Sequence, residues 1–357
     1  MTLCPPLKSK ITTPCPYFYE CGGCDFLDLD EKTYRELKQK TLEETYPNAN
    51  WIWVGPHSRR KINLQVSGKN ILGFFNKKSK TIVEIENCFV AEEKISELIL
   101  PLKNFLKTQE QNLFTQITIT SFDNGLDLIF GANRELNFQQ SQKLLNFGKE
   151  KNINISYRAK SGVTPVFMLR QNQLFYPDFK INLDSGIFIQ ATRPGLASIT
   201  KIIRDFLIKN KNIKNIADIY SGFGAYSFAI VDLAKSISAF EGDAAMANSI
   251  NKNAAANGFG NKIKAETCDL FINPVDKRDL NKFDLAIMNP PRNGAGPQSL
   301  EICKSTLKNV IYVSCNPESF MRDAKILIDS GFKITTLTAL DQFYSTNHLE
   351  LIAIFEK

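Results

Sequence analysis

The pattern of hydrophobic and polar positions changes near residue 186 of this chain. From there on, short hydrophobic runs alternate with stretches of helical spacing, and the runs are NIADIY, SISAFE, KIKAETC, FDLAIMN, VIYVS, KITTLTAL and LELIAIF. Strands that alternate with helices are typical of a doubly wound α/β sheet. We therefore expect a Rossmann-like α/β domain over residues 186–357.

The preceding part of the chain has a different pattern. A stretch with helical periodicity covers residues 92–106, and strand-like runs follow it as FTQITITSF, LDLIFGA, NINISYRA and VTPVFML. This mixture predicts an α+β module over residues 91–185, without a catalytic motif that we can identify. Residues 1–90 form a first unit, with a helical stretch, EKTYRELKQKTLEETY, and an alternating segment, ILGFFNKKSKTIVEI, that predicts a β-hairpin.

Composition excludes several classes of protein. With 43% hydrophobic residues, the chain is too apolar for a disordered protein. No run approaches the roughly 18 apolar residues of a membrane span, and the start, MTLCPPLKSK, lacks the apolar stretch of a signal peptide. We expect a cytoplasmic protein that has no membrane partner and acts as a monomer.

A basic excess leaves room for a nucleic-acid partner. The net charge is +7, which permits RNA binding but is also common among enzymes. Basic residues gather in the first unit around Phe74 and Phe75, and they are Arg59, Arg60, Lys61, Lys77, Lys78 and Lys80. This segment predicts either an RNA-binding face with aromatic stacking or a solvated strand edge whose lysines prevent aggregation.

Three of the eight cysteines form a C-x5-C-G-G-C cluster. Its two glycines allow a tight turn, so that the thiolates of Cys15, Cys21 and Cys24 can face one centre. A tetrahedral site needs a fourth ligand, and because neither of the two histidines has a ligand spacing, Cys88 is the best candidate. Thiolates suit zinc or an iron–sulfur cluster, and the spacing does not distinguish between them.

The first strands of the α/β domain carry a nucleotide-binding pattern. The strand IADIY leads into SGFG, where a Gly-x-Gly turn lets a ligand approach the backbone. The second strand ends in Glu241, roughly 20 residues further on, where an acid can bind the two ribose hydroxyls of an adenosine ligand. Ser227 stands at the third glycine position of the dehydrogenase fingerprint, so that class of enzyme agrees less well with the sequence.

Two later strands end in motifs that indicate methyl transfer. FDLAIMN ends in Asn289-Pro290-Pro291-Arg292, a turn found in S-adenosylmethionine-dependent methyltransferases that act on a base in nucleic acid. The next strand, VIYVS, ends in Cys315, which Asn-Pro follows. Because strands of such sheets end at the ligand face, this thiol is expected at the edge of the sheet where ligands bind.

Together these segments give the chain a family resemblance. It resembles the RNA uracil-5-methyltransferases that modify tRNA or 23S rRNA, through CPYFYECGGC, IFIQAT, DIYSGFGAYSF, FEGDAAMANSINKNAAANG, NPPRNGAG, YVSCNP and DQFYSTNHLE. The segments run in the family's order over nearly the whole chain, and SCNP with the downstream H-x-E is the most specific part. The resemblance implies a class I methyltransferase domain behind an N-terminal α+β domain that carries a four-cysteine cluster site.

The resemblance also implies roles for individual residues. S-adenosylmethionine is expected to contact Gln190, Tyr220, Glu241 and Asn289. A [4Fe–4S] cluster is expected on Cys15, Cys21, Cys24 and Cys88. Cys315 is expected to be the nucleophile and Glu350 the base, while an RNA contact by His348 stays open.

Departures from the family pattern bear on the substrate. Asn289 replaces the Asp of many members, a change seen in the smaller 23S rRNA branch, and we expect the chain to lack the extra N-terminal barrel of another rRNA branch. These two features favour 23S rRNA over tRNA. Ser221 stands where the family often has Cys, at a non-catalytic position, and we transfer no cofactor contact to Ala225.

Uracil methylation needs one cysteine and one carboxylate. C5 is a poor nucleophile, and addition of a thiolate to C6 makes it enolate-like before a base removes its proton. Exocyclic-nitrogen methyltransferases use the same sheet but need no cysteine, and they prefer an aromatic residue where Arg292 stands. Cytosine-5 enzymes also use a cysteine. An inactive iron–sulfur RNA-binding protein would leave Cys315 and Glu350 unexplained.

Overall fold

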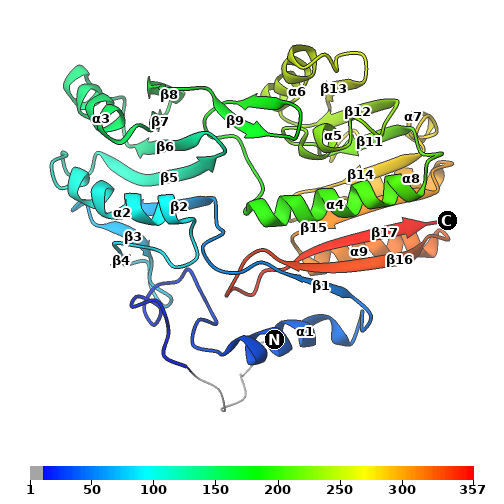
Figure 1. The fold of residues 1–357 in the computed structure, drawn as a ribbon, viewed down its shortest axis with the longest axis horizontal. Helices are drawn as coiled ribbons and strands as arrows, with labels where there is room; N and C mark the ends of the chain where they lie inside the picture. Colours follow the sequence, from blue (N-terminus) through cyan, green and yellow to red (C-terminus); the bar gives the residue numbers. More distant parts are fainter. Residues whose placement is uncertain (1–10) are drawn as a thin grey trace.

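The protein is built as two lobes, each around one large β-sheet (Figure 1). The computed structural model describes residues 11–357, so residues 1–10, with Cys4 and the start of the predicted first unit, lie outside the described residues. One sheet has eight strands and the other has seven. We name the two parts the eight-stranded lobe and the seven-stranded lobe.

The eight-stranded sheet combines the seven strands predicted for an α/β domain with one strand from the first unit. They are β1 (Asn50–Trp53), β11 (Asn215–Ile219), β12 (Ser236–Glu241), β13 (Ile263–Thr267), β14 (Leu285–Met288), β15 (Asn309–Ser314), β16 (Lys333–Asp341) and β17 (Glu350–Glu356). Their order is β1-β16-β17-β15-β14-β11-β12-β13. β17 is antiparallel to both neighbours, and the other pairs are parallel. The first unit thus contributes β1 to this sheet as an edge strand.

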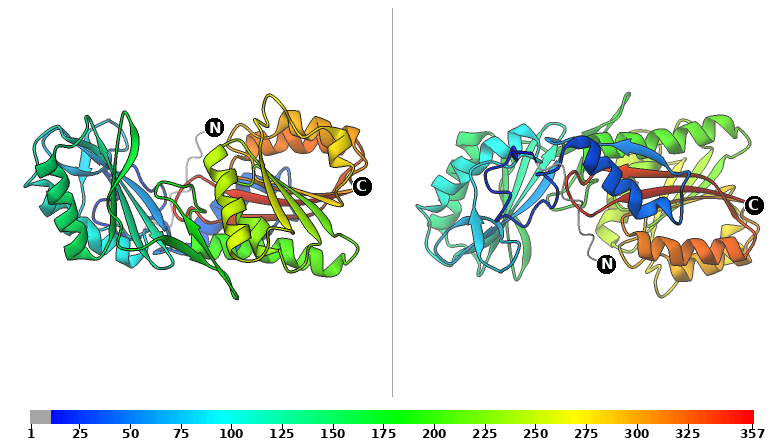
Figure 2. Two further views of the ribbon diagram at one scale, coloured as in Figure 1. Left: turned by 90° about the horizontal axis from the view of Figure 1, so that it is seen from above. Right: turned by 90° about the horizontal axis from the view of Figure 1, so that it is seen from below.

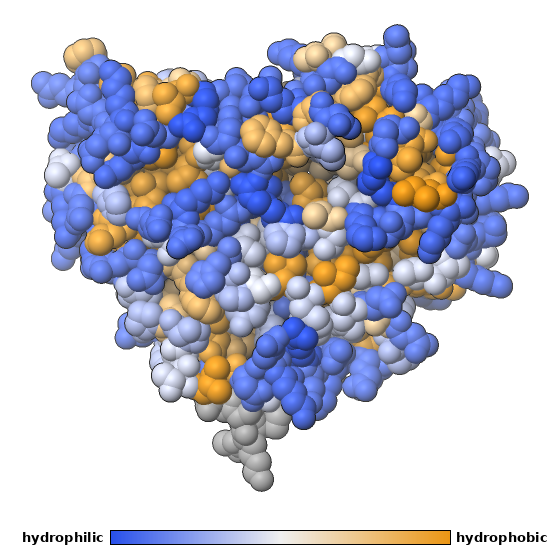
Figure 3. Space-filling view, viewed as in Figure 1, coloured by the Kyte–Doolittle hydropathy of each residue, from blue (hydrophilic) through white to orange (hydrophobic). Residues whose placement is uncertain are grey.

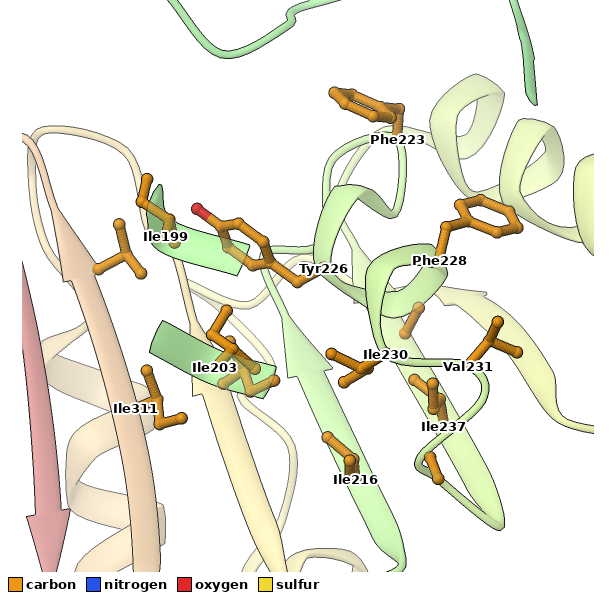
Figure 4. Packing of buried hydrophobic residues seen from close by; sticks show 14 of the residues in the cluster. Ile199, Ile203, Ile216, Phe223, Tyr226, Phe228, Ile230, Val231, Ile237 and Ile311 are labelled. Carbon is orange, nitrogen blue, oxygen red and sulfur yellow. The ribbon is translucent and has the colours of Figure 1, made fainter. Parts of the chain in front are cut away.

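Helices cover both faces of the eight-stranded sheet (Figure 2). One face carries α4 (Arg193–Lys209), α5 (Ala225–Ala229) and α6 (Ala244–Ala256). The other face carries α1 (Glu31–Glu43), α7 (Lys277–Leu280), α8 (Gly296–Lys304) and α9 (Pro317–Asp329). Successive residues of each central strand serve opposite cores, since Ile216 packs on the α4 side and Ala217 on the other. Figure 4 shows the α4 side, where Ile203 packs toward Ile311 and its neighbours.

The seven-stranded lobe has helices on one face of its sheet. Its strands are β2 (Lys61–Val66), β3 (Leu72–Phe75), β4 (Ile82–Glu84), β5 (Phe114–Phe122), β6 (Gly125–Ala132), β7 (Asn154–Ala159) and β8 (Gly162–Phe167). They lie in the order β4-β3-β2-β5-β6-β7-β8, and their core is shared with α2 (Glu93–Leu106) and α3 (Phe138–Lys151). The hairpin predicted over residues 71–85 is confirmed as β3 and β4, and the helix predicted over residues 92–106 is α2.

Ion pairs and a short sheet connect the two lobes. β9 (Asn172–Phe175) and β10 (Lys180–Leu183) form a two-stranded sheet, and the segment 184–192 leads from it into α4. At the start of α4, Arg193 Nε donates to Glu92 Oε1 at 2.8 Å, and its guanidinium also pairs with Asp123. Both acids belong to the seven-stranded lobe, so this arginine joins the lobes beside the predicted cofactor segment.

None of the helices in residues 11–357 has the length and apolar character needed to cross a bilayer. On the face drawn in Figure 3, hydrophilic residues predominate, and hydrophobic residues form separate groups between them.

Candidate active site

A cavity of about 580 Å³ lies at the carboxyl edge of the eight-stranded sheet. Its walls come from the segments that follow β11, β12, β14 and β15 and from the start of β17. The strand order reverses between β11 and β14, and open α/β sheets bind ligands at such a switch point. All six predicted catalytic and cofactor residues line this cavity: Gln190, Tyr220, Glu241, Asn289, Cys315 and Glu350.

The register of two strands brings Cys315 and Glu350 together. Ser314, the last residue of β15, pairs with Leu351 of the antiparallel strand β17. Cys315 follows the first of these residues and Glu350 precedes the second, so they occupy the next level of the ladder. Because β17 runs opposite to β15, its first residue lies at the edge where β15 ends. Two residues that are far apart in sequence thus face one cavity.

The Glu350 carboxyl is buried, with 3% of the residue exposed. Burial raises its pKa from 4.5 to about 7, although a hydrogen bond from Gln342 acts in the opposite direction. Gln342 Nε2 donates to Glu350 Oε2 at 2.7 Å. A carboxylate with a pKa near neutrality can take up a proton in one step of a reaction and release it in another.

Cys315 is half-buried, and its thiol has neighbours of both charges. Burial raises its pKa, the Glu350 carboxylate raises it further, and Arg292 lowers it. The resting thiol is therefore protonated, and the thiolate has to form when a substrate binds. Asn316 links the two motifs, because its side chain caps α9 and its Nδ2 donates to the Arg292 carbonyl at 3.0 Å.

Glu241 and the Gly-x-Gly turn form a further part of the wall. Glu241 Oε2 accepts a hydrogen bond from the backbone N–H of Gly222 at 2.7 Å, and Oε1 accepts one from Asp243 at 3.0 Å. Gly222 has a φ of 57°, in the left-handed region that glycine adopts without strain. The turn and the acid therefore hold each other in place beside the cavity.

The other predicted cofactor residues reach the cavity from separate elements. Asn289 follows β14, and its Nδ2 donates to Tyr226 Oη at 3.3 Å. Tyr220 directly follows β11, and its buried hydroxyl has no hydrogen-bond partner among residues 11–357. Gln190 lies before α4 and is 7% exposed. Their contacts to a cofactor stay a prediction, but each is placed where a bound nucleotide could meet it.

Several lining residues were missed by sequence reasoning. Asp269 lies two residues after β13, as Glu241 lies at the end of β12, and this position in the chain could have indicated it. Gln342 and Phe343 also line the cavity, beside His348, whose contact with RNA the sequence left open. For Gln342 the sequence carried no signal, because its partner Glu350 is reached only across the β16–β17 connection.

The predicted cluster ligands come from two segments that meet in the fold. Burial, followed by the nearby thiols of Cys88, Cys21 and Cys15, raises the pKa of Cys24 to about 12. The four sulfurs thus lie within electrostatic range of one another. Among residues 11–357, however, no group of three or more His, Cys, Asp or Glu side chains has a metal-binding arrangement. The four-cysteine cluster is therefore not confirmed.

The turn that carries three of these cysteines is fixed to the β3–β4 hairpin. The backbone N–H of Gly22 donates to the carbonyl of Phe75 at 2.8 Å. A Cβ at position 22 would lie 2.8 Å from the same oxygen, so only glycine allows this approach. The glycine predicted to allow a tight turn also allows the turn to dock.

The basic segment is less available to RNA than the sequence suggested. Arg60 is buried, with its guanidinium 3.5 Å from Asp123 and its Nε donating to the Ser121 carbonyl at 3.1 Å. The interpretation that Arg60 contacts RNA phosphates is therefore wrong. Arg59 lies over the ring of Phe343, 5.2 Å from its centroid, and lysines 77, 78 and 80 are exposed.

Relatives of known sequence extend over almost the whole chain. An uncharacterized RNA methyltransferase of Mesorhizobium japonicum is 28% identical in an alignment of 361 positions, gaps included. The alignment covers 98% of this chain and 85% of the relative. The 23S rRNA (uracil(1939)-C(5))-methyltransferase RlmD of Shewanella sp. strain MR-7 is 27% identical in an alignment of 378 positions, gaps included. The alignment covers 98% of this chain and 83% of the relative.

A solved structure has the same fold. The tRNA (uracil-54, C5)-methyltransferase of Pyrococcus abyssi, in complex with S-adenosyl-L-homocysteine, superposes with a TM-score of 0.73 at 22% identity. The match covers 94% of this chain and 86% of that chain. It confirms the class I methyltransferase fold that the sequence predicted. A family model described as tRNA (uracil-5-)-methyltransferase matches residues 57–357. That match includes every residue of the cavity, and the chain belongs to the tRNA (uracil-5-)-methyltransferase family.

Proposed function

We propose that this enzyme methylates C5 of a uridine in 23S rRNA, with Cys315 as the nucleophile and Glu350 as the base. S-adenosylmethionine-dependent methylation of uracil C5 in RNA is the activity of its family. The position of Cys315 and Glu350 in one cavity, each next to the Ser314–Leu351 pair of β15 and β17, carries the assignment of residues. A thiol beside a carboxyl of raised pKa suits a reaction that needs covalent activation and later proton removal.

Cys315 begins the reaction. Its thiolate forms a bond to C6 of the uracil, and the electron pair of the C5–C6 double bond moves toward C5 and O4. When bound, S-adenosylmethionine would supply the methyl group that C5 takes up, and the broken sulfur–methyl bond would leave S-adenosylhomocysteine. The target base has to leave its stack before C6 can be attacked. The cavity, at about 580 Å³, has the size of a pocket that holds a small ligand.

Glu350 completes the reaction. Its carboxylate removes the proton from C5, the C5–C6 double bond forms again, and the bond between C6 and sulfur breaks to release the Cys315 thiolate. Gln342 holds Glu350 Oε2, which leaves Oε1 to accept the proton. The pKa of about 7 allows the carboxylate to take this proton near neutral pH.

The proposal of 23S rRNA as the substrate is supported by two observations. Relatives that cover 98% of this chain are named as 23S rRNA uracil-5-methyltransferases, and Asn289 is the residue expected of the smaller 23S rRNA branch. For the cofactor, we propose that Glu241 binds the ribose hydroxyls and that Gln190, Tyr220 and Asn289 complete the site.

We also propose a [4Fe–4S] cluster on Cys15, Cys21, Cys24 and Cys88. The donor set suits it, because all four candidate ligands are cysteines within electrostatic range of one another, without the histidines common in zinc sites. When bound, the cluster would hold the turn of residues 15–24 against Cys88.

Two variants test the catalytic assignment with labelled cofactor and rRNA that lacks 5-methyluridine. Cys315→Ala should bind RNA and cofactor but form no covalent adduct. Glu350→Gln should accumulate a protein–RNA crosslink that survives denaturing gels and carries the labelled methyl group. Full activity of Cys315→Ala would overturn the proposal in favour of an exocyclic-nitrogen methyltransferase. Release of methylated RNA by Glu350→Gln at the wild-type rate would exclude Glu350 as the base.

A further inference from the structure

The loop between β16 and β17, residues 342–349, forms one wall of the catalytic cavity and leads directly into Glu350, the proposed base and the first residue of β17. Gln342, Phe343, His348 and Glu350 all line the cavity. From position 342 to position 349 the chain is irregular, so the repeating hydrogen bonds of a helix or strand do not hold it. Contacts from elsewhere in the protein therefore decide where these side chains point.

Lys38 on α1 supplies the first of these contacts. It is 2% exposed, and its Nζ lies 3.1 Å from Asp341 Oδ1. The same Nζ donates to the carbonyl of Thr346 at 2.8 Å and to that of His348 at 2.5 Å. An ammonium has three N–H donors, and all three acceptors belong to residues 341–348. One buried side chain thus joins the start of the loop to its end.

Ser345, in the middle of the loop, is held by the same N-terminal region. It has a φ of 61°, which is rare for a residue other than glycine, and it is 1% exposed. Its backbone N–H donates to Tyr34 Oη at 3.0 Å, its carbonyl accepts from the Asp25 N–H at 2.7 Å, and its Oγ accepts from the Phe26 N–H at 3.1 Å. Every polar group of Ser345 therefore bonds to residues 25–34.

Tyr34 joins these two sets of contacts. Its hydroxyl donates to Asp341 Oδ2 at 2.5 Å while it accepts from Ser345. The view from below in Figure 2 shows α1 in front of the strands that this loop connects. We name the buried cluster of Tyr34, Lys38 and Asp341 the loop staple. Lys38 and Tyr34 do not contribute to the cavity lining described above, so they act on it only through the loop.

We propose that the loop staple is a positioning device for the catalytic base: Lys38 and Tyr34 hold residues 341–349 so that Glu350 meets the C5 proton of the substrate. This inference rests on the proposed role of Glu350. Because S-adenosylmethionine is assigned to the segments after β10, β11, β12 and β14, the staple should affect proton removal and leave cofactor binding unchanged.

The staple also adjoins the four-cysteine site. Asp25 and Phe26 directly follow Cys24, and both bond to Ser345. Arg59 lies over Phe343 in the same loop and interacts electrostatically with Cys24 and Cys88. A change in the turn of residues 15–24 therefore reaches the catalytic loop through two independent contacts.

Lys38→Met tests the proposal because it keeps the length of the side chain and removes the ammonium. In the variant, amide hydrogen exchange of peptides covering residues 342–349 should accelerate by about tenfold in the absence of substrate. With substrate, the labelled Cys315–RNA crosslink should accumulate, since proton removal becomes slow. The dissociation constant of S-adenosylmethionine should stay the same.

Arg60→Met is the matched control, because it removes another fully buried cation that lies outside the loop. It should lower thermal stability without changing the amide hydrogen exchange of residues 342–349 or the amount of crosslink. Tyr34→Phe, which removes only a hydroxyl, is the second variant should Lys38→Met fail to fold. It should accelerate exchange in the same peptides by about threefold.

The outcomes separate the staple from the proposed function. If a folded Lys38→Met variant shows wild-type exchange in residues 342–349, the staple is overturned. The staple is also overturned if Lys38→Met accelerates exchange in the loop without accumulating the crosslink, provided that Glu350→Gln does accumulate it. If Glu350→Gln traps no crosslink, the role of Glu350 fails, and the positioning role of the staple fails with it, although faster exchange would still report a freed loop.

Discussion

Two regions of this protein hold partly buried cysteines whose pKa is raised, and they differ in what surrounds the sulfur. After burial, Cys24 has three other thiols and the Arg59 guanidinium as its charged neighbours, and the thiols have the larger influence on its pKa. Cys315 has one carboxyl, Glu350, and one guanidinium, Arg292. Like charges raise the pKa of a thiol and a cation lowers it. The first setting therefore suits a sulfur that stays bound to a metal, and the second suits a sulfur that changes its protonation state during a reaction.

The difference teaches that burial alone does not assign a role to a cysteine. Both regions carry the residue in a turn beside a sheet edge, and in both the strongest influence on the thiol is desolvation. The charges of the groups beside the sulfur decide whether the thiolate needs a permanently bound cation or forms only when a substrate is present.

The largest expected effect separates the two regions by stability. Cys24→Ser should remove iron from anaerobically purified protein and lower the free energy of unfolding by about 3 kcal/mol or more, since a tightly bound group stabilises the folded state. Cys315→Ser should keep the iron and the stability. Metal analysis and chemical denaturation measure both quantities, with Cys303→Ser as a matched control in α8. Stoichiometric zinc without iron in the wild-type protein would contradict the cluster.

The next effect concerns the cofactor. Glu241→Ala should weaken S-adenosylmethionine binding by about 1.5–3 kcal/mol, the range for a lost hydrogen bond to a charged group. Calorimetry should find the affinity of Cys24→Ser unchanged, because the cysteine turn lies outside the cavity lining. An unaltered affinity of Glu241→Ala would move the nucleotide site elsewhere.

The pH dependence of the catalytic site gives a smaller effect. Glu350 acts as a base only when ionised, so the rate of adduct resolution should rise as the pH increases through about 7. Gln342 stabilises the ionised form by donating to it. Gln342→Leu should therefore move the midpoint upward by about one pH unit, the equivalent of about 1.4 kcal/mol.

The sign of the stability effect at Glu350 is opposite to that of a salt-bridged acid. Its pKa is raised in the folded state, so the folded protein binds the proton more tightly than the unfolded chain does. The contribution of this group to stability is complete below a pH of about 4.5 and is lost as the pH rises through about 7. Denaturation of wild type and Glu350→Gln over this range measures the loss, and parallel curves would contradict it.

The smallest expected effect concerns the reactivity of Cys315. Arg292 lowers the pKa of this thiol, so Arg292→Gln should slow its alkylation at fixed pH by about threefold at low salt, and by less at high salt because Arg292 is exposed. Mass spectrometry of the modified peptide gives the rate. Equal rates at low salt would show that the exposed guanidinium is screened by solvent.

Much of the fold and of the site was predictable from local sequence. The alternation of hydrophobic runs after residue 186 indicated β11 to β17, and the residues that end those strands included Glu241, Asn289 and Cys315. This works because hydrophobic periodicity depends on neighbours along the chain, and because parallel strands of an α/β sheet end at one edge. The resemblance to a family then added Gln190 and Glu350, which no local pattern indicated.

The tertiary structure decided what depends on contacts between distant segments. Only the fold places β1 beside β16, buries Arg60 against Asp123 and brings Lys38 to the loop that carries Glu350. In the sequence, Lys38 and Arg60 look like ordinary surface cations on a helix and a strand. Both side chains are buried because elements that are far apart in the chain pack together around them. The hydrophobic pattern of a single segment does not encode this desolvation.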